Sequence, residues 1–215
     1  MTNTRILALV AILLLLGLSC GRTPITIDEL DALYAMEQGV ELRKQGLLRQ
    51  SFEELSEAIS LDPELALAYA ERGFVHYLGG KNTRAVEDVG RALKLNSQLP
   101  IAYNYRGLIF VSRGAPDNAI IDFTRAIQLD PRLQEAYLNR SNLYMANGQL
   151  GLSLDDVTAA ITLSPESAEL YLLRAQVHLR TDTPTKAVPD LEQVLSLTND
   201  EAMTLTVKRY LSLLQ

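Results

Sequence analysis

Apolar and small residues return along most of this chain at intervals of 34 residues. A tyrosine column, a leucine column and an alanine column keep this spacing: Tyr69, Tyr103, Tyr137 and Tyr171; Leu61, Leu95, Leu129, Leu163 and Leu197; Ala58, Ala92, Ala126 and Ala160. Glycine follows it too, at Gly46, Gly80, Gly114 and Gly148. Because no insertion is needed to keep the columns in register, we predict five repeats, at 32–65, 66–99, 100–133, 134–167 and 168–201.

Within one repeat the pattern predicts two helices. In the third repeat one apolar stripe with helical spacing precedes Gly114 and a second follows it. Gly114 is expected to end the first helix, because glycine tolerates the left-handed cap. Pro116 is expected to open the second, at a first-turn position where its missing N–H costs nothing. One hairpin cannot bury its apolar face alone, so consecutive hairpins should stack.

The sequences at both ends of the repeats predict closing elements. Thr26 and Glu29 have the spacing of a capping box, which begins the first helix shortly before the first repeat. Residues 202–214 have helical periodicity and predict a helix that caps the last repeat. Pro189 lies inside the second helix of the fifth repeat, so we expect a kink or a late start there.

These columns resemble the tetratricopeptide repeat (TPR) family. In the third repeat the matching residues are Gly107, Phe110, Ala119, Phe123, Ala126 and Pro131. The resemblance implies an all-α fold over residues 26–214, a right-handed TPR superhelix or α-solenoid of five helical hairpins plus a C-terminal capping helix. Because the family is a scaffold with many partners, the resemblance predicts a protein or peptide partner and does not identify it.

The resemblance also implies a partner-binding groove. In this family, certain first-helix positions line the inner face of the superhelix, and here they are apolar or carry amides. The candidate groove residues are Phe74, Tyr77, Asn104, Tyr105, Leu108, Asn139, Asn142 and Gln176. Basic residues occupy such positions only near the ends, at Arg43, Lys44 and Arg180. The alternative is that many of these side chains simply pack against the neighbouring repeat.

Two charged columns run through the last four repeats. The arginines are Arg72, Arg106, Arg140 and Arg174, and the aspartates are Asp88, Asp122, Asp156 and Asp190. In the first repeat both positions change together, to Gln38 and Glu54. This joint change favours structural ion pairs within each hairpin over a ladder of anion-binding arginines.

The amino-terminal residues indicate export and lipidation. Residues 6–19 are apolar and uncharged, too short to span a membrane but typical of a signal peptide, which we place at 1–19. Leu16 to Cys20 resembles the lipobox of bacterial lipoproteins, with Gly17 where leucine is usual. The resemblance implies a lipid on Cys20, a linker over 20–25 and a place in a bacterial envelope, at the periplasmic face of the outer membrane in a Gram-negative cell. The alternative is a secreted protein with one unused thiol.

The net charge and the motifs of the sequence argue against nucleic acid binding, metal binding and enzyme activity. The formal net charge of −6 argues against nucleic acid as a partner. His76 and His178 replace an aromatic residue of the family pattern three repeats apart, so we expect packing residues rather than a shared metal. Because no catalytic or phosphate-binding motif occurs, we predict no enzyme, no metal and no cofactor. The prediction is a membrane-anchored scaffold or adaptor for envelope, secretion or pilus assembly; the alternatives are a self-associating scaffold, possible as a homo-oligomer, and, less favoured, an enzyme.

Overall fold

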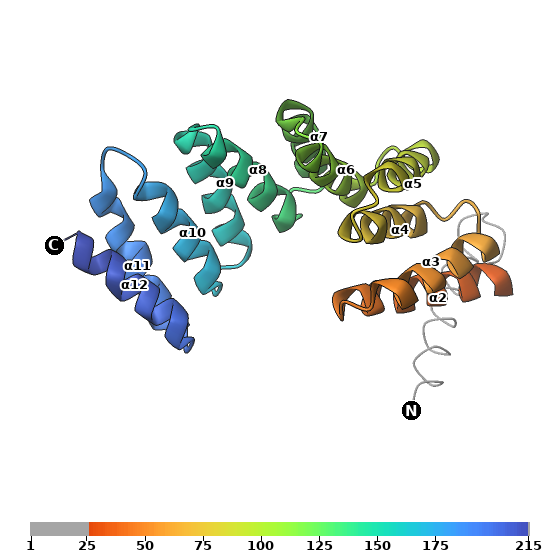
Figure 1. Cartoon of the computed structure of the whole chain (residues 1–215), viewed down its shortest axis with the longest axis horizontal. Helices are drawn as coiled ribbons and strands as arrows, with labels where there is room; N and C mark the ends of the chain where they lie inside the picture. The colour runs from red at the N-terminus through yellow and green to blue at the C-terminus, as the bar shows by residue number, and fades with distance from the viewer. Residues whose placement is uncertain (1–25, 215) are drawn as a thin grey trace, which may run out of the picture. The chain divides into compact units, whose positions relative to one another are not determined.

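The computed structural model describes residues 26–214, and these residues form helices without a β-strand (Figure 1). The predicted signal peptide (1–19), Cys20 and the linker (20–25) therefore lie outside the described residues. Within residues 26–214 the predicted all-α architecture of paired hairpins is confirmed. No helix in the described part of the chain is long and apolar enough to cross a membrane. The chain divides into two compact units, Met1–Ser97 and Gln98–Gln215.

The first unit contains two hairpins. They are α2 (Ile27–Lys44) with α3 (Leu48–Leu61), and α4 (Ala66–Leu78) with α5 (Asn82–Leu95). The predicted capping box opens α2, because the Thr26 hydroxyl accepts the Glu29 N–H at 3.2 Å and the Glu29 carboxylate accepts the Thr26 N–H at 2.7 Å. Leu55 and Ala58 of α3 lie in a core with residues of α2 and α4.

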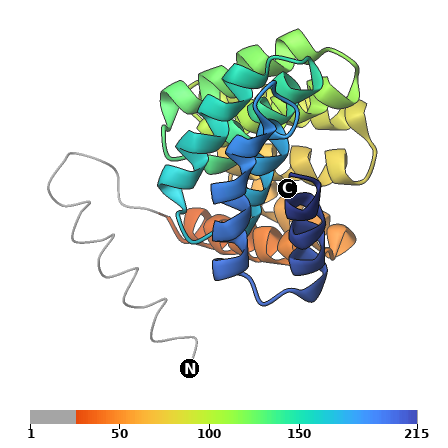
Figure 2. The ribbon, with the colours of Figure 1, turned by 90° about the vertical axis from the view of Figure 1, so that its left-hand side faces the viewer.

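The second unit contains three hairpins and a closing helix. The hairpins are α6 (Pro100–Ser112) with α7 (Pro116–Leu129), α8 (Gln134–Ala146) with α9 (Leu150–Leu163), and α10 (Ala168–His178) with α11 (Val188–Leu197). The closing helix α12 (Glu201–Leu213) runs antiparallel to α11 (Figures 1 and 2). Its Val207 is fully buried in a core with Leu191 and Val194 of α11.

Glycines fix the geometry of the hairpins at two kinds of position. Gly114 has φ +73°, in the left-handed region that ends a first helix, and the other three members of its column share this conformation. Gly107 instead permits a close approach between α6 and α7, because a Cβ there would lie 2.5 Å from Cε1 of Phe123. The glycine column thus acts as the repeat pattern predicted.

The fifth repeat departs from the other four, as Pro189 predicted. Asp182 stands where the earlier repeats have the turn glycine. A 3₁₀ segment, η1 (Pro184–Ala187), follows, and α11 begins only at Val188, with Pro189 in its first turn. The structure therefore shows a late start rather than a kink, since proline is tolerated where no intrahelical N–H is needed.

Candidate partner-binding surface

Three consecutive first helices of the second unit present one column of side chains. Leu108 of α6, Asn142 of α8 and Gln176 of α10 occupy the same position in successive repeats. Asn142 is exposed, and Leu108 and Gln176 are partly exposed. The column combines one apolar side chain with two amides, so it can bury apolar surface and hydrogen-bond a peptide backbone without using charge.

Two of the predicted groove residues are buried, so their side chains are not available to a partner. Asn104 is 2% exposed and Tyr105 is 5% exposed. The side-chain Oδ1 of Asn104 accepts a hydrogen bond from Nδ2 of Asn139 at 2.9 Å, which joins α6 to α8. Asn104 therefore supports the alternative of packing between repeats, and we revise its expected role, and that of Tyr105, from partner contact to internal support. Asn139 is partly exposed and remains beside the column.

In the first unit the predicted groove residues form an aromatic pair. The rings of Phe74 and Tyr77 stack with centroids 5.7 Å apart and planes 15° from parallel. The guanidinium of Arg43 lies 5.1 Å from the centroid of Phe74, and its Nε is 3.0 Å from the buried carboxylate of Glu71. The charge of Arg43 is thus compensated inside the unit.

Sequence reasoning missed Glu71. Its signal was an acidic residue at a first-helix position where the three later repeats have Tyr105, Asn139 and Leu173, although the first repeat also has an acid there, Glu37. The partner arginine lies 28 residues earlier, in the preceding hairpin, so spacing within one repeat gives no sign of the pair.

The arginine and aspartate columns meet as bidentate ion pairs in all four repeats. In each, Nε and Nη2 of the arginine donate to the two carboxylate oxygens, at 2.6–2.9 Å. The aspartates are buried, and their hydrogen bonds raise the pKa of the arginines above the usual value. Because each guanidinium is already paired, this geometry favours the structural interpretation over an anion ladder.

A third contact ties three of the four arginines to the preceding repeat, and the sequence analysis did not anticipate it. Nη1 of Arg140 donates to the hydroxyl of Thr124 at 2.7 Å, and Arg72 and Arg174 make longer contacts of 3.4 Å with Ser56 and Thr158. Each hydroxyl lies 16 residues before its arginine, and each aspartate lies 16 residues after it. Arg72, Arg140 and Arg174 therefore join neighbouring hairpins within each unit, whereas Gly90 offers no hydroxyl to Arg106.

The two histidines lie in different surroundings: His76 packs against an aromatic ring, and His178 is partly exposed. The His76 ring is buried and lies 5.2 Å from the ring of Phe52, and burial is the main cause that lowers its pKa. Burial likewise lowers the pKa of His178, whose Nδ1 is buried without a hydrogen-bond partner in the described residues. Across residues 26–214 no three His, Cys, Asp or Glu side chains gather as a metal site would require.

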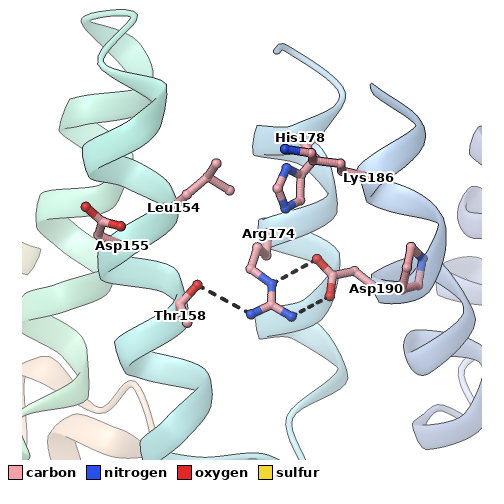
Figure 3. A pocket seen from close by; sticks show the side chains of 8 residues that line it. Leu154, Asp155, Thr158, Arg174, His178, Lys186 and Asp190 are labelled. Atoms are coloured by element: carbon pink, nitrogen blue, oxygen red, sulfur yellow. Dashed lines mark hydrogen bonds and ion pairs between the residues drawn. The ribbon is translucent and has the colours of Figure 1, made fainter. Parts of the chain in front are cut away.

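The second unit also contains a pocket of about 540 Å³ (Figure 3). Leu154, Asp155 and Thr158 of α9 form one wall, and Arg174 and His178 of α10 with Lys186 of η1 form the other. The contact between Arg174 and Thr158 crosses between the two walls, and the hydrogen bonds between Arg174 and Asp190 join α10 to α11 behind the second wall. None of these residues belongs to the predicted groove.

Comparison with known proteins agrees with the repeat architecture. A tetratricopeptide repeat model matches residues 76–133 and 138–202, which together exceed half of the chain. No curated protein sequence matches. A solved structure of pilF from Pseudomonas aeruginosa has a TM-score of 0.77 at 16% identity, over 88% of this chain and 86% of that one.

Two further solved structures are similar. YrrB, described as a TPR protein with an unusual peptide-binding site, has a TM-score of 0.61 at 20% identity, over 83% of this chain and 92% of that one. A thermophilic TPR protein of Thermus thermophilus has a TM-score of 0.69 at 16% identity, over 84% and 98% respectively. At these identities the likeness shows the fold alone.

Proposed function

Because this chain belongs to the tetratricopeptide repeat family, we propose that it is a lipid-anchored adaptor of a bacterial cell envelope that holds a protein or peptide partner on its first helices. The observation that carries the proposal is the column of Leu108, Asn142 and Gln176, which stays accessible while the neighbouring Asn104 is buried. The description of YrrB as a TPR protein with a peptide-binding site supports the same class of partner.

The chemistry of the column predicts the kind of segment that binds. Leu108 supplies apolar surface, and the amides of Asn142 and Gln176 supply both donors and acceptors. These positions contain no lysine or arginine to pair with a carboxylate or a phosphate. The partner segment is therefore uncharged and largely apolar, and its backbone bonds the amides.

Site-specific crosslinking tests where the partner binds. A photoreactive amino acid at position 142 or 176 should form a covalent product with an envelope protein in living cells. The matched control places the same group at Asn118, an exposed asparagine on the second helix α7. If the crosslinked product forms at position 118 and not at 142 or 176, the partner binds the second-helix surface and the proposed column is wrong.

Substitutions separate binding from folding. Asn142→Ala and Gln176→Ala should weaken partner capture at an unchanged melting temperature, because neither side chain is buried. Asn118→Ala should change neither. If the crosslinked product is a second copy of this chain, and light scattering gives a dimer mass, self-association replaces the adaptor function.

The envelope part of the proposal rests on Cys20 and the residues before it. The Cys20→Ala variant should fail to incorporate labelled fatty acid and should leave the membrane fraction or remain unprocessed. If the parent protein also fails to incorporate labelled fatty acid, lipid anchoring is disproved, and the proposal of partner binding is unaffected. A partner in envelope, secretion or pilus assembly is the finer part of this proposal, and the identity of the crosslinked protein tests it.

A further inference from the structure

The pocket between the fourth and fifth repeats has a counterpart between the first and second repeats. Three repeat lengths separate the two places, and five of six wall positions carry the same kind of residue. In the order pocket and counterpart, the pairs are Asp155 and Glu53, Thr158 and Ser56, Arg174 and Arg72, His178 and His76, Lys186 and Arg84, and, as the one change of kind among these six, Leu154 and Phe52. Of the two other lining residues, Asp190 matches Asp88, whereas Pro189 stands where the counterpart has Glu87.

In the counterpart, the aromatic ring of Phe52 occupies the space between the walls. Its centroid is 5.2 Å from the His76 ring and 5.9 Å from the guanidinium carbon of Arg72. Phe52 is 36% exposed, so its ring packs between two side chains at the surface. The first unit thus shows how these two walls hold an aromatic side chain.

At the pocket this ring is missing. Leu154 replaces the phenylalanine, and within the described part of the chain Arg174 meets a single ring, that of Tyr171 at 5.7 Å. Arg174 is nevertheless held in place by Asp190, with Thr158 at 3.4 Å, as Arg72 is held by Asp88, with Ser56 at the same distance. The late start of α11 places η1 with Lys186 beside this opening (Figure 3).

We propose that this pocket binds an aromatic side chain of a partner protein, in the place that Phe52 occupies in the first unit. The ring would lie against the guanidinium of Arg174 and the imidazole of His178, so cation–π attraction adds to the burial of apolar surface. The volume of about 540 Å³ is within the range of ligand sites and exceeds what one ring needs. Asp155 and Lys186 are exposed at the pocket and provide one charge of each sign for the residues beside the ring.

This contact is separate from the proposed partner-binding column. Arg174 and His178 each lie two residues from Gln176 on α10. Two residues correspond to a rotation of about 200° around a helix, so these side chains lie on the face of α10 opposite to Gln176. A failure of the pocket proposal therefore leaves the proposed function untouched, and the reverse also holds.

The test uses two peptides and nuclear magnetic resonance of the purified full-length protein. N-acetyl-Gly-Phe-Gly-amide should shift the amide signals of residues 154–158 and those of Arg174 and His178, while the signal of Gln176 and that of Asn142 report binding to the column instead. The matched peptide with leucine in place of phenylalanine should bind about fivefold more weakly, since it lacks the interaction with Arg174. Equal shifts from the two peptides, or no shifts at either set of residues, would overturn the proposal.

Reciprocal substitutions make the test specific. Leu154→Phe should fill the pocket from within and abolish the shifts, while Phe52→Leu should create a second binding place, reported by residues 52–56 and 72–76. Circular dichroism checks the fold of both variants, and the Phe52→Leu arm stands alone if Leu154→Phe does not fold. Retained binding in folded Leu154→Phe, or no new site in Phe52→Leu, contradicts the assignment. Pocket signals that move with protein concentration alone would place a second copy there and would also overturn it.

Discussion

At the scale of single residues, ion pairs between arginines and buried aspartates contribute to the stability of this protein. Asp122 is 3% exposed, and both of its carboxylate oxygens accept hydrogen bonds from Arg106. The free energy of such a pair comes chiefly from avoiding a buried charge without a partner. Arg106 is more accessible than Asp122, so the two halves of the pair are not equivalent.

Removal of either partner should therefore have unequal effects. Arg106→Ala leaves the buried carboxylate uncompensated and should lower the free energy of unfolding by roughly 3 kcal/mol. Asp122→Ala should cost less, and the double variant should lose less than the sum of the two single variants. Urea unfolding of the four proteins measures the coupling. The exposed pair of Arg49 and Glu53 is the control and should show almost none; additive losses at Arg106 and Asp122 would contradict the interpretation.

The buried imidazole of His76 predicts a pH dependence. Its pKa is lowered from 6.5 in the folded protein, mainly by burial, so the unfolded chain binds the proton more readily. The stability that the neutral ring contributes is therefore complete above pH 6.5 and is lost as the pH falls through that value towards the lower folded pKa. His76→Phe, which copies Phe110 of the next repeat, should lose less stability between neutral and mildly acidic pH. Identical pH profiles of the two proteins in urea unfolding would contradict this.

At the scale of elements, helix periodicity and turn residues were enough to predict the hairpins. The turn glycines, the capping box at Thr26 and the effect of Pro189 all act within a few residues of chain, so their local sequence contains the signal. The bond between Asn104 and Asn139 joins two repeats, and whether an amide faces a partner or a neighbouring helix depends on that packing. The pocket likewise depends on packing between repeats, because its walls come from α9 of one hairpin and α10 of the next.

The closing helix α12 provides an element-scale prediction. Val207 is fully buried against α11, whereas Leu205, two residues earlier, is 71% exposed. Val207→Ala should lower the free energy of unfolding by roughly 2 kcal/mol, because it leaves a cavity between α11 and α12. Leu205→Ala is the matched control and should stay within about 0.5 kcal/mol of the parent. Similar effects of the two changes in urea unfolding would mean that α12 does not close the second unit as described.

At the scale of the whole molecule, the charged side chains and the proposed binding surface are separate. The chain is acidic overall, with a formal net charge of −6, yet the column of Leu108, Asn142 and Gln176 has no charge. Recognition by apolar contact and amide hydrogen bonds should therefore respond little to ionic strength. The paired arginines and aspartates instead stabilise the scaffold.

Partner binding should accordingly be nearly independent of salt. Once crosslinking has identified the partner, its dissociation constant should change less than about threefold between low salt and roughly 0.5 M sodium chloride, a concentration that screens exposed charges within a few ångströms. Calorimetry at several salt concentrations measures this. A steep loss of affinity with salt would show that exposed charges carry recognition.

The arginine that joins two hairpins has a consequence for how such a chain changes in evolution. Arg140 needs a hydroxyl 16 residues upstream and a carboxylate 16 residues downstream. Duplication or loss of a complete 34-residue segment such as 134–167 keeps each arginine 16 residues before its aspartate, and it keeps a hydroxyl 16 residues before the next arginine because Thr158 repeats Thr124. Gain or loss of a single residue inside α8 or α9 instead turns part of that helix by about 100°, so that Arg140 and Asp156 no longer face each other. The length of the protein is therefore free to change in whole repeats and is resistant to change in smaller steps.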